Sequence, residues 1–187
     1  MTNKTPIQHT KLGKWIKKIG NYLGFNLRIK GFNRVGVRII HTNGLIENIG
    51  FTYNSRVNKG AALQASLMAG SALGGVSSPL APLYIALSTA SLTPAAGDTT
   101  LASETSVAGL GRALGTAQNY VAASTLDGAA SYDVAKTFTL TGANTTVVSA
   151  ALFDAVSTGN LFAEANFSSS AVLVTGDLLQ VTWTINI

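Results

Sequence analysis

The sequence predicts a mainly β chain, in which an antiparallel β-sandwich of the jelly-roll kind follows a basic N-terminal arm made of a helix and a hairpin. Short β-rich runs separated by Gly, Pro, Ser, Thr and Asp fill the second half of the chain, as is typical of antiparallel sandwiches. The dipeptide Asn43-Gly44 lies between two further β-rich runs and predicts a hairpin, because both turn residues need a positive φ. Basic residues are concentrated before residue 60.

The composition favours a folded protein without an enzymatic site. The chain has 187 residues, of which 47% are hydrophobic and 11% charged, which is enough for a core and argues against disorder. It has no cysteine and only two histidines, His9 and His41, so thiol chemistry is excluded and a zinc site is poorly supplied. The glycine-rich segments lack phosphate-binding spacing, and most acids stand singly beside turn residues. We therefore predict no enzyme activity, no cofactor and no metal.

The charge differs between the two parts of the chain. Residues 1–60 carry eleven Lys and Arg against the single acid Glu47, a net charge of +10. Residues 61–187 carry two bases against seven acids, a net charge of −5. Such asymmetry predicts two regions that face different partners.

The elements follow in order along the chain. A basic amphipathic helix is expected over residues 10–23, then the hairpin between 34 and 53, then a second helix over 58–73. Asn58 is the expected cap of this second helix, Leu63, Leu67 and Met68 its apolar face, and Gly74-Gly75 its end. Strands are expected over 83–87, 120–123, 136–140, 146–153, 161–167 and 178–187, the last with strict period-two alternation. The predicted organisation is a basic docking region (1–60), a connecting helix or linker (61–77) and a sandwich (78–187).

The docking region supplies the candidate binding residues. Its predicted apolar anchors and electrostatic contacts are Lys14, Trp15, Lys17, Lys18, Ile19, Tyr22, Arg28, Arg34 and Arg38. The same pattern also suits a surface helix packed by its apolar stripe, a nucleic-acid binder or a membrane-surface binder. No RNA- or DNA-binding motif accompanies it. The uncharged stretch 61–97 is interrupted by Gly and Pro, so we do not expect it to span a membrane.

From about Arg56 onward the order of motifs resembles that of a class of small structural proteins of tailed bacteriophages. The segments that carry the resemblance are Asn58-Lys-Gly60, Leu83–Thr89, Thr93–Glu104, Gly111-Arg112, Phe138–Gly142, Ala151–Ala155, Gly159–Ala163 and Gly176–Ile185. Together they cover about two thirds of the chain. Ser88-Thr89 stand where members of this class usually carry glycines.

The resemblance implies a non-enzymatic virion protein assembled in the host cytoplasm. Our first hypothesis is a capsid decoration (cement) protein that grips the major capsid protein or other virion proteins through its basic arm and forms a homo-oligomer, a trimer being favoured. The alternatives are a neck, tail or fibre-adaptor subunit and, from a different class, a glycan- or receptor-binding module, since jelly rolls often carry lectin sites. Glycan binding requires exposed aromatic side chains, and most aromatics after residue 78 fall inside strand patterns.

Overall fold

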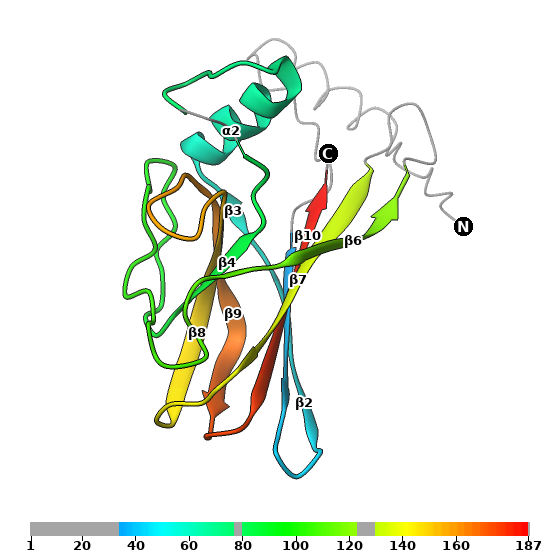
Figure 1. Ribbon diagram of the computed structural model, residues 1–187, viewed down its shortest axis with the longest axis vertical. Helices are drawn as coiled ribbons and strands as arrows, with labels where there is room; N and C mark the ends of the chain where they lie inside the picture. The colour runs from blue at the N-terminus through cyan, green and yellow to red at the C-terminus, as the bar shows by residue number, and fades with distance from the viewer. Residues whose placement is uncertain (1–33, 77–79, 123–129, 187) are drawn as a thin grey trace, which may run out of the picture. The chain divides into compact units, whose positions relative to one another are not determined.

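The computed structural model describes residues 34–76, 80–122 and 130–186, which form two antiparallel five-stranded sheets and one helix. In Figure 1 the sheets face each other as the two layers of a β-sandwich. The predicted mainly β fold and its sandwich are confirmed. The predicted basic helix at residues 10–23 lies outside the described residues.

Sheet A has the strand order β2-β1-β10-β7-β6. Its strands are β1 (Arg34–Ile40), β2 (Ile46–Tyr53), β6 (Thr116–Val121), β7 (Ser131–Thr139) and β10 (Leu178–Asn186). Strict alternation in β10 places Leu179, Val181, Trp183 and Ile185 in the core, as period two requires of a half-buried strand. The other face of sheet A is directed away from sheet B.

Sheet B has the order β3-β9-β8-β4-β5. Its strands are β3 (Ser55–Arg56), β4 (Tyr84–Ser88), β5 (Ala113–Leu114), β8 (Thr145–Phe153) and β9 (Leu161–Leu173). Both faces of this sheet are largely buried. One faces sheet A, and the other is covered by residues 89–105, whose Leu92 and Leu101 pack in a second small core with Ala151 and Phe153.

The hairpin predicted at Asn43-Gly44 is confirmed, with its turn between β1 and β2. Its first strand is hydrogen-bonded along its whole length to β10, and Val35, Val37 and Ile39 lie in the main core. The hairpin is thus an integral part of the sandwich, whereas the sequence analysis assigned it to a docking region at 1–60. The docking role predicted for residues 1–33 lies outside the described residues.

Helix α2 (Asn58–Ala69) confirms the second predicted helix but differs in its ends and its face. Its N-cap is Val57 and not Asn58, because the Val57 carbonyl accepts the first helical hydrogen bond, from the Ala61 N–H at 3.1 Å. The helix ends at Gly70, four residues before the predicted Gly74-Gly75. Leu63 is buried, whereas Leu67 and Met68 are exposed, so the predicted apolar face is wrong in two of three positions. No helix of the described residues is long and apolar enough to cross a membrane.

Candidate binding face

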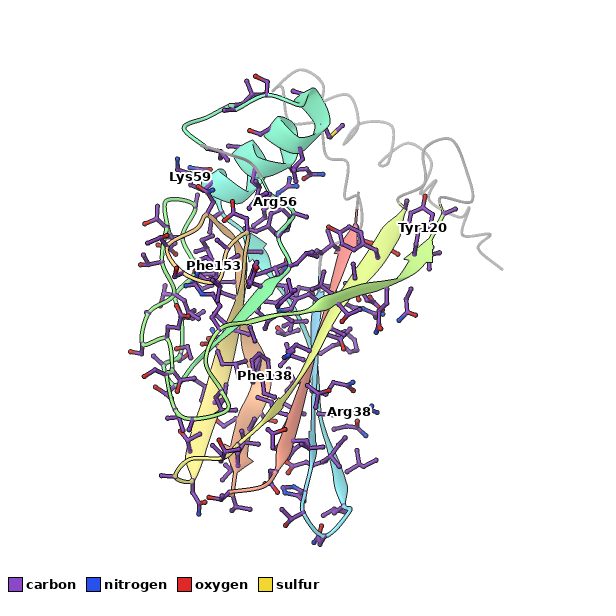
Figure 2. The ribbon with its side chains drawn as sticks, in the orientation of Figure 1. Arg38, Arg56, Lys59, Tyr120, Phe138 and Phe153 are labelled. Carbon is purple, nitrogen blue, oxygen red and sulfur yellow. The ribbon has the colours of Figure 1, made fainter. Side chains whose placement is uncertain are left out.

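Two of the predicted binding residues, Arg34 and Arg38, lie in the described part of the chain, both on β1. They alternate with the buried Val35 and Val37, so their side chains are on the outer face of sheet A. Figure 2 shows Arg38 pointing away from the core, and Phe138 on the opposite side of the sheet between the two layers. The remaining predicted residues lie outside the described residues: Lys14, Trp15, Lys17, Lys18, Ile19, Tyr22 and Arg28.

The register of sheet A arranges the outer side chains in rows that cross the strands. The first row contains Arg34, Thr184 and Asp133, and the third contains Asn48, Arg38 and Gln180. The middle row contains Phe51, Gly36, Thr182 and Ala135. The side chains of Gly36, Thr182 and Ala135 are smaller than most of those in the two rows beside them, so the outer face of sheet A is hollowed along the middle row.

This hollow is an open groove of about 570 Å³, which we call the sheet-A groove. Gly36 and Thr182 form its floor, and Arg34 and Arg38 stand on either side of them. Phe51, whose side chain is 56% exposed, stands at the β2 end of the middle row. Gln118 and Asn119 of β6 line the opposite end.

A chain of hydrogen bonds holds one wall of the sheet-A groove in place. Arg34 Nε donates to the Thr184 hydroxyl at 3.4 Å, and that hydroxyl donates to Asp133 at 2.8 Å. Asp133 also accepts a bond from the Asn119 side-chain amide at 3.0 Å. The Arg34 guanidinium carbon lies 5.6 Å from the Phe51 ring centroid, within cation–π range. Four strands are therefore tied together along this wall.

The opposite wall carries an unneutralised cation. Among the described residues, Arg38 makes no hydrogen bond or ion pair, and its side chain is exposed. Asp133 is the acid lining the groove, and its carboxylate is already engaged by Thr184 and Asn119. The groove is thus polar and carries a net positive charge, with one apolar ring at its end.

A second polar cluster lies on sheet B and joins three segments of the chain. Arg112 donates two hydrogen bonds to the Glu104 carboxylate, at 2.9 and 2.6 Å, and a third to the carbonyl of Ala155 at 3.3 Å. Its guanidinium carbon lies 3.5 Å from the centroid of the Phe153 ring. Bidentate pairing combined with stacking on an aromatic ring is what arginine provides and lysine does not. We interpret this cluster as a structural clasp.

Tight backbone contacts and capped turns account for further motifs. A Cβ on Gly60 would lie 1.9 Å from the carbonyl of Phe162, so helix α2 lies directly against β9 at this point. The buried Asp154 accepts two hydrogen bonds from Asn160 and so closes the turn between β8 and β9. Gly60, Asp154 and Asn160 belong to the segments that carry the resemblance to phage structural proteins, so these segments have a structural role in the fold.

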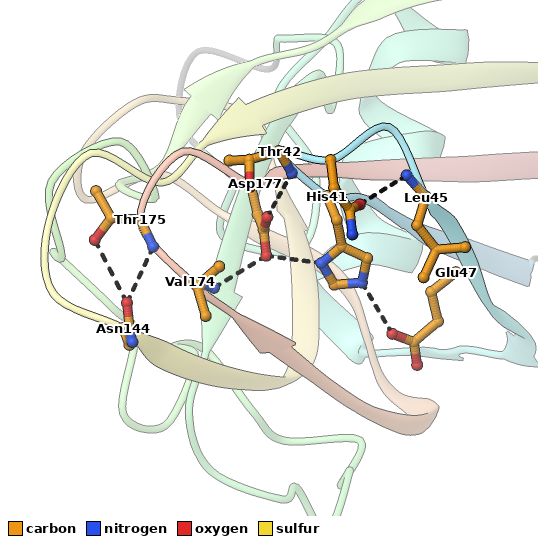
Figure 3. Close-up of polar contacts among 9 residues, drawn as sticks. His41, Thr42, Leu45, Glu47, Asn144, Val174, Thr175 and Asp177 are labelled. Atoms are coloured by element: carbon orange, nitrogen blue, oxygen red, sulfur yellow. Dashed lines mark hydrogen bonds and ion pairs between the residues drawn. The ribbon is translucent and has the colours of Figure 1, made fainter.

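Figure 3 shows a third cluster, at the end of the sandwich where the β1–β2 and β9–β10 turns meet. The buried Asp177 accepts bonds from the backbone N–H groups of Thr42 and Val174, at 3.1 and 3.0 Å, and lies 3.0 Å from His41 Nδ1. Glu47 lies 3.3 Å from the other ring nitrogen, Nε2. The histidine therefore joins the hairpin turn to the β9–β10 turn.

The two carboxylates favour the protonated imidazole. Burial lowers the pKa of His41, but the hydrogen bonds and charges of Asp177 and Glu47 outweigh it and raise the pKa above its ordinary value. Burial likewise raises the pKa of Asp177, yet the backbone donors of Val174 and Thr42 together with His41 bring it below its ordinary value. Only an imidazolium can donate hydrogen bonds from both ring nitrogens. The protonated His41 can therefore bond to Asp177 and Glu47 at the same time, and its role here is to hold the two turns together.

The described residues contain no group of three or more His, Cys, Asp or Glu side chains that could hold a metal ion. The sequence analysis missed most of the sheet-A groove, including Phe51, Asp133, Thr182 and Thr184. The alternation of β10 alone could have predicted that Thr182 and Thr184 lie on its outer face. Which residues of the other strands lie beside them can be known only from the register of four strands.

A β-sandwich tied together by side-chain clasps and capped turns defines a structural module. The family model described as "Podophage GP4 fiber I protein gp80" matches residues 61–184, and the chain belongs to this family. No curated protein and no solved structure matches the chain.

Family membership identifies the protein as a phage structural protein of the fibre type and a component of the virion. The resemblance to phage structural proteins is confirmed to this extent. The first hypothesis, capsid decoration, gains no support from the family, which fits the neck, tail or fibre alternative better.

Proposed function

We propose that this chain is a fibre or fibre-adaptor subunit of the phage particle and acts as a non-enzymatic building block. The observation that carries the proposal is the match of residues 61–184 to the family of a podophage fibre protein. The matched residues include the Glu104–Arg112 clasp and the turn closed by Asp154. A rigid, internally tied sandwich suits a part that is held at the outside of a particle.

The proposal includes self-association and attachment through separate parts of the chain. The edge strand β6 carries the exposed Tyr120 and Val121, with exposed fractions of 68% and 59%, and exposed apolar side chains on a strand edge favour contact with another copy. A homo-oligomer, with a trimer favoured, would use this edge. Residues 1–33 would attach to other virion proteins through the basic and apolar side chains already named, from Lys14 to Arg28.

The copy number of the chain in purified particles tests the proposal. Quantitative mass spectrometry with isotope-labelled peptides measures the ratio of this chain to the major capsid protein in the same sample. A few to a few dozen copies per particle is the expected result for a fibre. Hundreds of copies would instead support shell decoration and overturn the proposal, and absence from the particle would contradict both assignments.

A further inference from the structure

The sheet-A groove has the chemistry of a carbohydrate site. We propose that it binds an acidic glycan, a chain of sugars that carry carboxylate groups. Nothing in the family match assigns this site, because Arg34, Arg38 and Phe51 precede the matched residues. The inference is separate from the proposed place in the particle, since it concerns binding by the purified protein.

The shape of the groove suits a flat chain laid across the strands. Neighbouring strands lie about 4.8 Å apart, so sheet A spans roughly 19 Å from β2 to β6, the length of a short oligosaccharide. The floor is formed by the small residues Gly36 and Thr182, which leave room for sugar rings between the two walls. The exposed ring of Phe51 stands at one end, where the apolar face of a sugar can pack against it.

The polar groups around the groove match the hydroxyl groups of sugars. Gln180 and Gln118 each offer a donor and an acceptor, and Thr182 adds a hydroxyl on the floor. The bonded chain from Arg34 through Thr184 to Asp133 and Asn119 fixes one wall before a ligand arrives, which lowers the entropic cost of binding.

Charge selects an acidic sugar over a neutral one. Arg38 is exposed and, among the described residues, unpaired, and a guanidinium pairs with a carboxylate in bidentate fashion. A nucleic acid is disfavoured, because its tight binding rests on several phosphate contacts and Asp133 would face them. A peptide that adds a strand would use a sheet edge, whereas the groove lies over β1 and β10, which are paired on both sides.

Gly36 allows the groove to be filled without a change of charge. A Cβ at this position would meet only the Thr182 carbonyl oxygen, at 3.9 Å, which is ordinary contact. Gly36→Val therefore places a branched side chain on the floor, and valine is favoured in strands. Thr139→Val is the matched control, because Thr139 is exposed and lies outside the groove on β7.

The experiment measures binding to the full-length chain by isothermal titration calorimetry. The probes are hexasaccharides of alginate, oligogalacturonate and hyaluronan, with maltohexaose as the uncharged control. We expect at least one acidic hexasaccharide to bind at least tenfold more tightly than maltohexaose. Gly36→Val and Arg38→Gln should each weaken that binding at least tenfold, while Thr139→Val and Arg56→Gln leave it unchanged. Circular dichroism confirms that each variant is folded, and Gln180→Ala replaces Gly36→Val if that variant is not.

Three results would overturn the proposal. One is the lack of binding to all three acidic hexasaccharides at millimolar concentration. Another is binding that persists in Gly36→Val, which would indicate unspecific attraction to the basic residues before residue 34. The third is loss of a homo-oligomer in Gly36→Val by sedimentation velocity, which would indicate that another copy covers the groove. None of these results changes the copy number measured in particles, so the two proposals fail independently.

Discussion

Glu164 lies on β9, on the side opposite Ala163 and Ala165 of the main core, and is 2% exposed. Burial raises the pKa of Glu164 from its ordinary 4.5 to about 7, and the hydrogen bond and negative charge of Asp98 add to this effect. The neutral Glu164 carboxyl donates to Asp98, whose carboxylate also accepts a bond from the Ala95 N–H at 2.6 Å. Ionisation of Glu164 should therefore weaken the attachment of the loop that contains Ala95 and Asp98 to sheet B.

The pKa values give the sign and the size of the effect. Between pH 4.5 and about 7 the folded protein retains a proton on Glu164 that the unfolded chain has lost. The stabilisation is fully present below pH 4.5 and is lost as the pH rises through 7. The difference between the two pKa values corresponds to about 3 kcal/mol of unfolding free energy.

Urea unfolding of the wild type and of Glu164→Gln, from pH 4.5 to 8, measures this effect. The glutamine is neutral at every pH and its amide can still donate to Asp98. We expect the free energy of unfolding of the variant, minus that of the wild type, to increase by about 3 kcal/mol over this range. His41 and Asp177 titrate in both proteins, so their contributions cancel in the difference. A difference that stays constant with pH would refute the argument from burial.

Three further predictions concern the sandwich itself. Deletion of residues 1–60 should unfold the protein because it removes β1 and β2 from the core; circular dichroism measures the loss of strand content. A double-mutant cycle of Glu104→Gln and Arg112→Gln, read by urea unfolding, should give a coupling of about 2 kcal/mol, since the pair is bidentate and the Arg112 side chain is only 11% exposed. Gly109→Ala should cost about 3 kcal/mol or more in the same assay, because its Cβ would lie 1.7 Å from a backbone carbonyl of β7.

Each of these predictions has its own control. Gly97→Ala has open space around the added methyl group, so it should cost less than about 1 kcal/mol, and an equal cost at both glycines would refute the contact argument. A coupling near zero would mean that the Glu104–Arg112 pair behaves like an exposed ion pair. A folded protein after deletion of residues 1–60 would show that β10 does not need β1.

Local signals predicted the elements well because the physical cause of each element is local. Asn43-Gly44 predicted the hairpin, and the alternation of residues 178–187 predicted β10 and its buried face. The partner of a strand is not local. The hairpin was placed in a docking region because its basic outer face, Arg34 and Arg38, resembles the basic segment before it, while its pairing with β10 joins residues more than a hundred positions apart.

The candidate site could be predicted only in part for the same reason. Arg34 and Arg38 were identified by their charge, but a groove exists only where a small residue on one strand faces small residues on the next. Gly36 opposite Thr182, and Thr182 opposite Ala135, are such pairs. Only the aromatic residues after 78 were considered for glycan binding, so Phe51 was not among them.

The family match covers only some of the residues that form the sheet-A groove. Residues 61–184 contain both members of the Glu104–Arg112 clasp, the Asp154 turn and the three strands β6, β7 and most of β10 that form one side of the groove. Both arginines and the aromatic ring of the groove come from residues 34–53, before the match begins. The matched residues thus supply one side of the groove, and the hairpin, which is itself part of the sandwich, supplies the charge and the ring. Substitutions at Arg38 should consequently alter ligand binding while leaving the scaffold intact.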